Sequence, residues 1–304
     1  MYRPLGPRSQ RGMFLPALVL LLAAAGLGWL LARQDSPASR DLAREMRTAQ
    51  ALLTAREALI GFAATYRNNE HPNADFGYLP CPDLDGDGSS ETCGSKDQTS
   101  VGRLPYLTLN LPDLRDGAGE CLWYAVSGSF KNNPKADTLN WDSTGKLRLL
   151  DANGHPITLP GDEAGLAAAI VIAAGPPRPG QERSAGPERC GGDAEARNIA
   201  QYIEALGNRA DNELIDVRAL AGNDRIVTIT TGDIYRQLKR RASYAPWLQR
   251  VFQANADCLA KPVLPAVVAP QRHGPVELGK LPAFESLSGP CRNETLRDAA
   301  RNWI

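Results

Sequence analysis

One long helix is encoded by ASRDLAREMRTAQALLTAREALIGFAATY, residues 38–66 of the 304-residue chain. Its apolar side chains recur at intervals of three, four or seven residues, which places them on one face of a helix. Ser36 and Pro37 precede it as a helix-start signal, with serine as the cap and proline in the first turn. We therefore predict an amphipathic helix over residues 36–66 that packs on a sheet. Its predicted apolar stripe comprises Leu42, Met46, Ala49, Leu53, Ile60 and Ala63.

An apolar run lies directly before this helix. Residues 13–32 carry no charged side chain, and at 1.5 Å per residue they reach about 30 Å, the thickness of the bilayer hydrocarbon. Residues 1–12 form a basic leader with three arginines and no acid. Because basic flanks stay in the cytoplasm, we predict a transmembrane helix over residues 13–35, with the remaining chain outside the cytoplasm. A cleaved secretory signal is the alternative, which fits less well because the run is long and no small-residue cleavage site follows it.

The six cysteines are interpreted through this location. An oxidising compartment favours disulfides, and no CxxC pair supports a zinc or thioredoxin-type site. We predict a Cys81–Cys93 bridge, a crosslink of a kind that typically contributes about 2–4 kcal/mol. The pairing of the other four cysteines does not follow from the sequence, and the pairs that we expect are Cys121–Cys190 and Cys258–Cys291.

The composition is that of a globular protein rich in turns. Apolar residues make up 43% of the chain, and 34 basic residues balance 34 acidic ones. A nucleic-acid-binding protein usually carries a basic excess, so we expect no nucleic-acid partner.

The body of the chain is predicted to be α+β, with the long helix packed on an antiparallel sheet and with extra helices. Residues 67–242 form the extracytoplasmic α+β domain in this interpretation, and residues 243–304 form a helical, proline-rich extension. Strands are expected at 103–109, 121–130, 165–175 and 225–231, with a hairpin over 146–159. Further helices are expected at 194–206, 233–241 and 244–259, and a last short one at 293–304.

A candidate metal loop lies within GYLPCPDLDGDGSSETCG, residues 77–94. Its acidic residues fall at the odd positions of a calcium loop, and Gly88 falls at the sixth position, where the turn needs glycine. The twelfth position is Gly94 rather than a glutamate, and the prolines nearby exclude an incoming helix, so the loop is not an EF-hand. We predict a partial calcium loop, with an Asp/Gly turn that caps backbone amides as the alternative. The predicted ligands are Asp83, Asp85, Asp87 and Glu91.

Catalytic motifs are missing from the sequence. The three histidines do not form an HExxH or another ligand spacing, and neither GxSxG nor a Gly-Lys-Ser phosphate loop is present. We therefore expect that the protein is not an enzyme.

Six stretches carry a resemblance to the type IV pilin-like proteins, the minor pilins and the pseudopilins. The first two are the short basic leader ending in QRG and the apolar run from Met13. The other four are AREALIGFAATY at 55–66, GYLPCPDLDGDG at 77–88, GRLPYLTLNLPDLRDGAGECLWYAVSGSF at 102–130 and NDRIVTITTGDIYRQLKRR at 223–241. They span most of the chain, and the part from 77 to 130 is the most specific.

This resemblance implies a role in assembly. It implies cleavage after Gly12 by a prepilin peptidase and methylation of the new N-terminus at Met13. It also implies a single-pass protein of the bacterial inner membrane, with a cytoplasmic N-terminus and a periplasmic body, which joins other pilins or pseudopilins in a type IV pilus or a type II secretion pseudopilus. The alternative is a membrane-anchored periplasmic binding protein or enzyme of unknown ligand.

Two residues depart from the family pattern. The fifth residue after the cut is usually glutamate in the family, and here it is Ala17, while Pro16 also differs from the usual residue. The glutamate offsets the positive N-terminus of a neighbouring subunit in a dry bundle. Because family members at the filament tip also lack it, Ala17 favours a tip or initiator position.

Overall fold

The computed structural model describes residues 14–34, 37–69, 76–135, 139, 141–161, 165–183, 190, 197–206, 215–219, 222–259, 268–273 and 276–280. The chain divides into two compact units, residues 1–47 and residues 48–304. The predicted helix at 293–304 lies outside the described residues.

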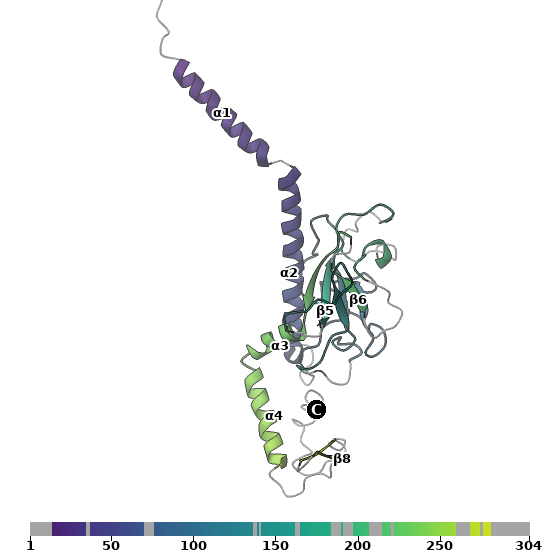
Figure 1. Cartoon of the computed structure of the whole chain (residues 1–304). Helices are drawn as coiled ribbons and strands as arrows, with labels where there is room; N and C mark the ends of the chain where they lie inside the picture. Colours follow the sequence, from purple (N-terminus) through teal and green to yellow (C-terminus); the bar gives the residue numbers. More distant parts are fainter. Residues whose placement is uncertain are drawn as a thin grey trace, which may run out of the picture. The chain divides into compact units, whose positions relative to one another are not determined.

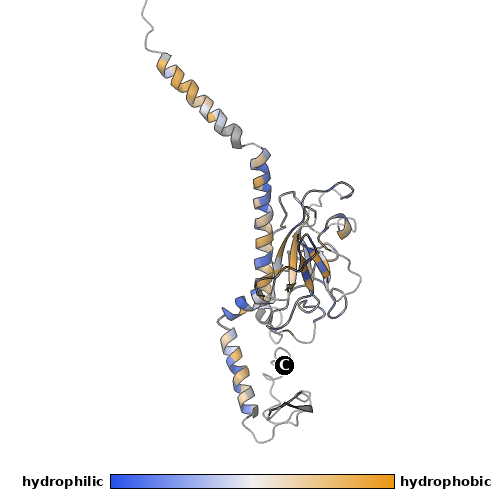
Figure 2. Ribbon diagram, in the orientation of Figure 1, coloured by the Kyte–Doolittle hydropathy of each residue, from blue (hydrophilic) through white to orange (hydrophobic). Residues whose placement is uncertain are grey.

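Helix α1 (Phe14–Gln34) dominates the first unit (Figure 1). Apolar colour covers most of it in Figure 2. Among the helices of the described residues, none combines the length and the apolar character that a membrane crossing requires. The helix predicted at 13–35 is present over the described residues 14–34, but the prediction that it spans a membrane is not confirmed. The large apolar side chains that α1 exposes are Leu15, Leu18, Val19, Leu20, Leu21, Leu22, Leu27 and Trp29.

Helix α2 (Pro37–Asn69) has no buried residue from 37 to 50, and its burial begins at Ala51. Ala55, Leu59 and Ala63 are fully buried at intervals of four residues and enter the core of the second unit. The predicted stripe is wrong in its first four members, because Ala49 is exposed and the side chains of Leu42, Met46 and Leu53 are each more than half exposed. Its last two members, Ile60 and Ala63, are buried as predicted.

The second unit contains a four-stranded sheet in which every pairing is antiparallel. A smaller sheet pairs β3 with β4 antiparallel and with β6 parallel, and a separate hairpin joins β8 to β9. The four-stranded sheet has the order β1 (Ser100–Arg103), β2 (Trp123–Val126), β5 (Ala169–Ala173) and β7 (Arg225–Ile229). The other strands are β3 (Leu147–Leu150), β4 (Leu166–Ala167), β6 (Ile215–Arg218), β8 (Val268–His273) and β9 (Val276–Lys280).

The four-stranded sheet separates two apolar cores. Successive side chains of a strand point to opposite faces, so Tyr124 packs on the side of α2 while Trp123 packs on the side of β3 and β6. Figure 1 shows α2 running alongside the sheet that contains β5. The predicted helix-on-sheet arrangement of the α+β body is confirmed, and the second sheet adds a further layer that was not predicted.

Three predicted elements need correction. The strand predicted at 103–109 is wrong beyond Arg103, where β1 ends. Pro105 has no amide to donate, and the chain turns over the next residues, with Asn110 at a φ of 54°. The predicted helix at 194–206 is reduced, in its described part, to the single 3-10 turn η1 (Ile199–Gln201). After that turn the chain pairs with β6, as the 2.7 Å hydrogen bond from the Arg218 amide to the Ala205 carbonyl shows. The strand predicted at 225–231 stops at Ile229.

Two helices follow β7 as predicted. Helix α3 (Thr231–Lys239) begins with a capping box, in which the side chains of Thr230 and Asp233 each accept a backbone amide hydrogen bond from the other residue. Helix α4 (Tyr244–Leu259) packs Tyr244 and Trp247 against Phe76, with ring centroids 5.8 and 5.3 Å from the phenyl ring.

An ion pair ties α2 to α3. The Arg56 guanidinium lies 2.7 Å from an Asp233 carboxylate oxygen and donates a hydrogen bond of 2.9 Å to the Thr228 carbonyl. The Arg56 side chain is 20% exposed, whereas Glu57, which also pairs with Arg56 at 2.8 Å, is 69% exposed. The partners on α3 and β7 are therefore held in a drier environment than the partner on α2 itself.

Replacing Arg56 should destabilise the second unit. We expect Arg56→Met to lower the free energy of unfolding by about 1–3 kcal/mol, because it removes the 2.7 Å partner of the Asp233 carboxylate, which keeps Thr230 and Arg236, and the side-chain donor to the Thr228 carbonyl. Urea unfolding of the full chain in a mild detergent, followed by circular dichroism, measures the change. The control Glu57→Gln should change stability by less than about 0.5 kcal/mol, since exposed pairs contribute little. Equal effects of the two substitutions would contradict this view of the ion pair.

Candidate metal centre

A disulfide closes the acidic loop. Cys81 and Cys93 are bonded, as predicted, with an S–S distance of 1.98 Å, and both side chains are buried. The expected Cys121–Cys190 bond is also present. The side chains of Cys258 and Cys291, the third expected pair, lie outside the described residues.

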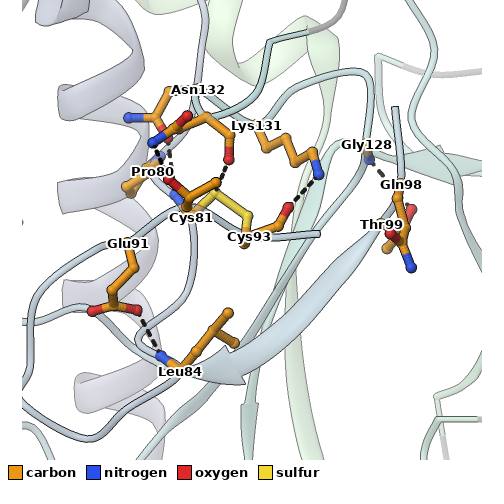
Figure 3. The surroundings of a disulfide bond; sticks show 12 residues. Pro80, Cys81, Leu84, Glu91, Cys93, Gln98, Thr99, Gly128, Lys131 and Asn132 are labelled. Carbon is orange, nitrogen blue, oxygen red and sulfur yellow. Dashed lines mark hydrogen bonds between the residues drawn. A yellow bond between two sulfur atoms is a disulfide. The ribbon is translucent and has the colours of Figure 1, made fainter. Parts of the chain in front are cut away.

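Hydrogen bonds hold both ends of the loop in place. The amides of Asp83 and Arg103 donate to each other's carbonyls at 3.0 and 2.9 Å, which joins the loop to β1. At the other end, the buried Lys131 ammonium donates to the carbonyls of Cys93 and Ser95, the latter at 2.6 Å. Figure 3 shows Lys131 reaching the carbonyl of Cys93 beside the disulfide, with Asn132 on the Cys81 side. Lys131 thereby provides a donor to the carbonyl of the buried Cys93.

The four predicted ligand residues converge. One carboxylate oxygen from each of Asp83, Asp85, Asp87 and Glu91 lies within 4.8 Å of the others. Each carboxylate also accepts from the loop backbone. Asp83 accepts from the amides of Gly86 and Gly88 at 2.6 and 2.9 Å, and Glu91 accepts from the amide of Leu84 at 2.8 Å, the bond drawn in Figure 3. The loop therefore has both the Asp/Gly turn of the alternative interpretation and the converging carboxylate oxygens of the predicted calcium loop.

A glycine is required at position 88. Its φ is +89°, in the left-handed region that side chains rarely adopt, and a Cβ there would lie 2.6 Å from the ring of Tyr106. The prediction that the sixth loop position needs glycine thus has a structural reason, which includes a close approach that the sequence does not reveal.

Burial and the repulsion among the carboxylates disfavour the charged forms of Asp83 and Glu91. Burial raises the pKa of Asp83 above its usual range, although the amides of Gly86 and Gly88 lower it, and the charges of Asp87 and Asp85 raise it further. Burial also raises the pKa of Glu91, and the three neighbouring aspartates act in the same direction. The Glu91 Oε1 atom is buried and accepts no hydrogen bond from the described residues.

These residues fit a calcium ion. Calcium takes six to eight oxygen ligands, and carboxylates, carbonyls and water all serve. The unpartnered Oε1 atom of Glu91 is an oxygen that a cation would satisfy, and the four carboxylates supply the charge. The processing residues Gly12 and Met13, in contrast, lie outside the described residues.

Two buried ionisable groups were not predicted. The Arg103 guanidinium stacks 3.9 Å from the ring centroid of Trp123 and 4.5 Å from that of Tyr202, and burial lowers its pKa to about 10. It donates to the Cys121 carbonyl at 3.0 Å. Arginine and aromatic residues far apart in the sequence give no signal of such stacking.

Asp224 is the second buried group. Its side chain is 3% exposed, and its Oδ2 atom accepts from the amides of Glu204 and Ala205 at 2.8 and 2.7 Å. Its Oδ1 atom is buried and receives no hydrogen bond from the part of the chain that is described. Burial raises the pKa of Asp224 to about 7, and the Glu204 charge contributes in the same direction, while Arg183 opposes it.

Comparisons with known proteins identify no relative. No family model matches the sequence, and no curated protein or solved structure matches it significantly. The resemblance to the type IV pilin-like proteins therefore depends on the residues that carry it.

Asp224 should make stability depend on pH. Its pKa is raised in the fold from an ordinary value of 3.8 to about 7, so its contribution to stability is complete below pH 4 and is lost as the pH rises through 7. Between pH 5 and pH 8 the wild-type chain should therefore lose more stability than Asp224→Asn. Urea unfolding at the two pH values measures this difference. The exposed control Asp257→Asn should keep the wild-type slope, and an Asp224→Asn variant with that same slope would refute the role of Asp224.

Proposed function

We propose that the protein is a structural subunit, a minor pilin or pseudopilin, of a type IV pilus or a type II secretion system. The observation that carries the proposal is the run of exposed apolar side chains on α1, which follows a basic leader and precedes a disulfide-bonded helix-on-sheet body. In this role α1 inserts in the inner membrane and later leaves it to pack among the helices of other subunits. The body stays in the periplasm.

The unburied apolar face of α2 supports an assembly role. Leu42, Met46, Ala49 and Leu53 recur at the spacing of a helix–helix seam, and all four are exposed, the first three in the part of α2 that has no buried residue. Exposed apolar faces on a helix mark surfaces that another protein covers. A sister subunit that presents a similar helix is the partner that we propose.

Ala17 favours a position at the tip or at the start of an assembly. With no carboxylate at the fifth residue after Gly12, the chain has no group to neutralise the positive N-terminus of a neighbour in a dry bundle. A subunit at the tip or at the start of assembly has no such neighbour to accommodate. Immunogold labelling should therefore mark filament ends, and labelling spread evenly along the shaft would reject this placement.

The calcium loop stabilises the body in this proposal. The disulfide, the bridge to β1 and the Lys131 contacts already fix the loop ends, so a bound cation would relieve the repulsion among the carboxylates between them. The cation supplies positive charge and a coordination centre for Asp83, Asp85, Asp87 and Glu91, and no chemical step depends on it.

Processing of the leader is the main test of the function. Co-expression of the full chain with a prepilin peptidase should shorten it by residues 1–12 and add one methyl group at Met13, both of which intact-mass spectrometry detects. Gly12→Leu should abolish the cleavage because it alters the residue at the cut. Gly6→Leu, the same change earlier in the leader, should leave cleavage intact.

Two results would refute the assembly role. One is a mature chain that still begins at Met1 in the presence of an active peptidase. The other is a processed chain that never co-purifies with a filament or a secretion apparatus.

Calcium binding is tested separately. Isothermal titration of the full chain in detergent should show calcium uptake, with the bound ion raising the unfolding temperature and EGTA reversing the increase. Asp87→Asn should weaken binding by about tenfold or more, since it removes one charged ligand. The control Asp97→Asn changes a nearby carboxylate that instead pairs with Lys146 at 2.8 Å, and it should bind calcium as the wild type does. No uptake at millimolar calcium would overturn the metal site and leave the assembly role standing.

A further inference from the structure

A cleft of about 710 Å³ opens between α3 and α4. This volume is within the range of small-molecule sites, about 300–1,000 Å³. The cleft is lined mostly by apolar surface, and loop residues complete it beside the two helices. Its principal lining side chains are Trp141, Tyr235, Lys239, Tyr244, Leu248 and Phe252.

Aromatic side chains dominate the cleft. Tyr235 and Tyr244 are buried and form part of the core, whereas Trp141 is 41% exposed and Phe252 is 58% exposed. Phe252 is therefore the more exposed of the two residues, and it lies on a helix whose Trp247 and Val251 are buried. Covering such rings with a flat apolar ligand is favourable in proportion to the area removed from water.

Positive charge borders the same cleft. Arg236 and Lys239 both line it and both are exposed. Arg236 lies 3.2 Å from Asp233, a carboxylate that it shares with Arg56 at 2.7 Å, while Arg56 has a second partner in Glu57. No ion pair joins Lys239 to another residue of the described chain. Over residues 231–259 there are five basic and two acidic side chains.

We propose that this cleft binds a small aromatic carboxylate. The aromatic ring lies against Leu248 and Phe252, and the carboxylate points to Lys239, with Arg236 as the second cation. The apolar lining provides affinity for the ring, and the cations discriminate in favour of an anion. This site lies outside both the metal loop and the apolar faces of α1 and α2, so it adds a ligand-binding activity to the proposed assembly role.

Matched probes test the charge requirement. The full chain in non-ionic detergent is titrated with 2-naphthoate and with 2-naphthamide, which has a similar shape and no charge, and empty micelles serve as the blank. Saturation-transfer NMR and equilibrium dialysis report the bound fraction. We expect naphthoate to bind about tenfold more tightly than naphthamide, since a charge-assisted hydrogen bond exceeds a neutral one.

Variants locate the site. Lys239→Glu should weaken naphthoate binding by about tenfold or more and leave naphthamide binding unchanged. Arg240→Glu makes the same charge change at the adjacent residue, which does not line the cleft, and should retain most of the naphthoate affinity. Ala245→Trp places a large side chain in the cleft and should abolish binding of both probes. Urea unfolding confirms that each variant is folded.

Three outcomes would overturn the proposal. The wild-type chain would bind neither probe at millimolar concentration, or Lys239→Glu and Arg240→Glu would weaken naphthoate binding equally, which indicates only a general field effect. The third outcome is a folded Ala245→Trp variant that binds both probes as the wild type does, because binding would then lie elsewhere.

Discussion

The complete burial of β5 is the constraint on which the rest of the body depends. All five residues from Ala169 to Ala173 are fully buried, so both faces of this central strand must be covered by other elements. Helix α2 covers one face, and the sheet of β3, β4 and β6 covers the other. Fully buried Ala55 and Ala63 form part of the α2 surface in the first core, and small side chains of this kind allow a helix to approach a sheet closely. The layers, and with them the loops that carry the acidic residues and the cleft, are positioned by this burial.

The elements that depend on local pattern were predictable. The run from Ala169 to Ala173 is apolar at every position, which is typical of a strand buried on both faces, and the helix predicted at 233–241 is found two residues earlier, at 231–239, after the Thr230 cap. Which apolar residues of α2 are buried was not predictable in the same way. Leu53 and Leu59 both fit a helical periodicity, and only the contacts with distant strands determine that Leu59 is buried while Leu53 is exposed.

The candidate site likewise has features that local sequence predicts and features that depend on distant contacts. Asp83, Asp85, Asp87 and Glu91 lie within nine residues of one another, so their spacing alone was sufficient to predict that their oxygens converge. The close contact of Tyr106 with Gly88 could not be predicted, because it depends on a turn some eighteen residues away. Asp224 was missed for a related reason. Its burial arises from the return of residues 204–206 to β6, where a helix was expected.

The exposed apolar surface of α1 is large enough to drive association with another molecule. Burying one large aliphatic or aromatic side chain is favourable by about 1.5–3 kcal/mol, so eight of them represent at most about 12–24 kcal/mol. A total of this size is comparable to the stability of a whole domain, about 5–15 kcal/mol, and a chain that left these side chains in water would associate through them. In the assembly role that we propose, lipid and then neighbouring helices cover these side chains. The interaction that covers α1 would be exchangeable in that role, whereas the core around β5 is fixed by its complete burial.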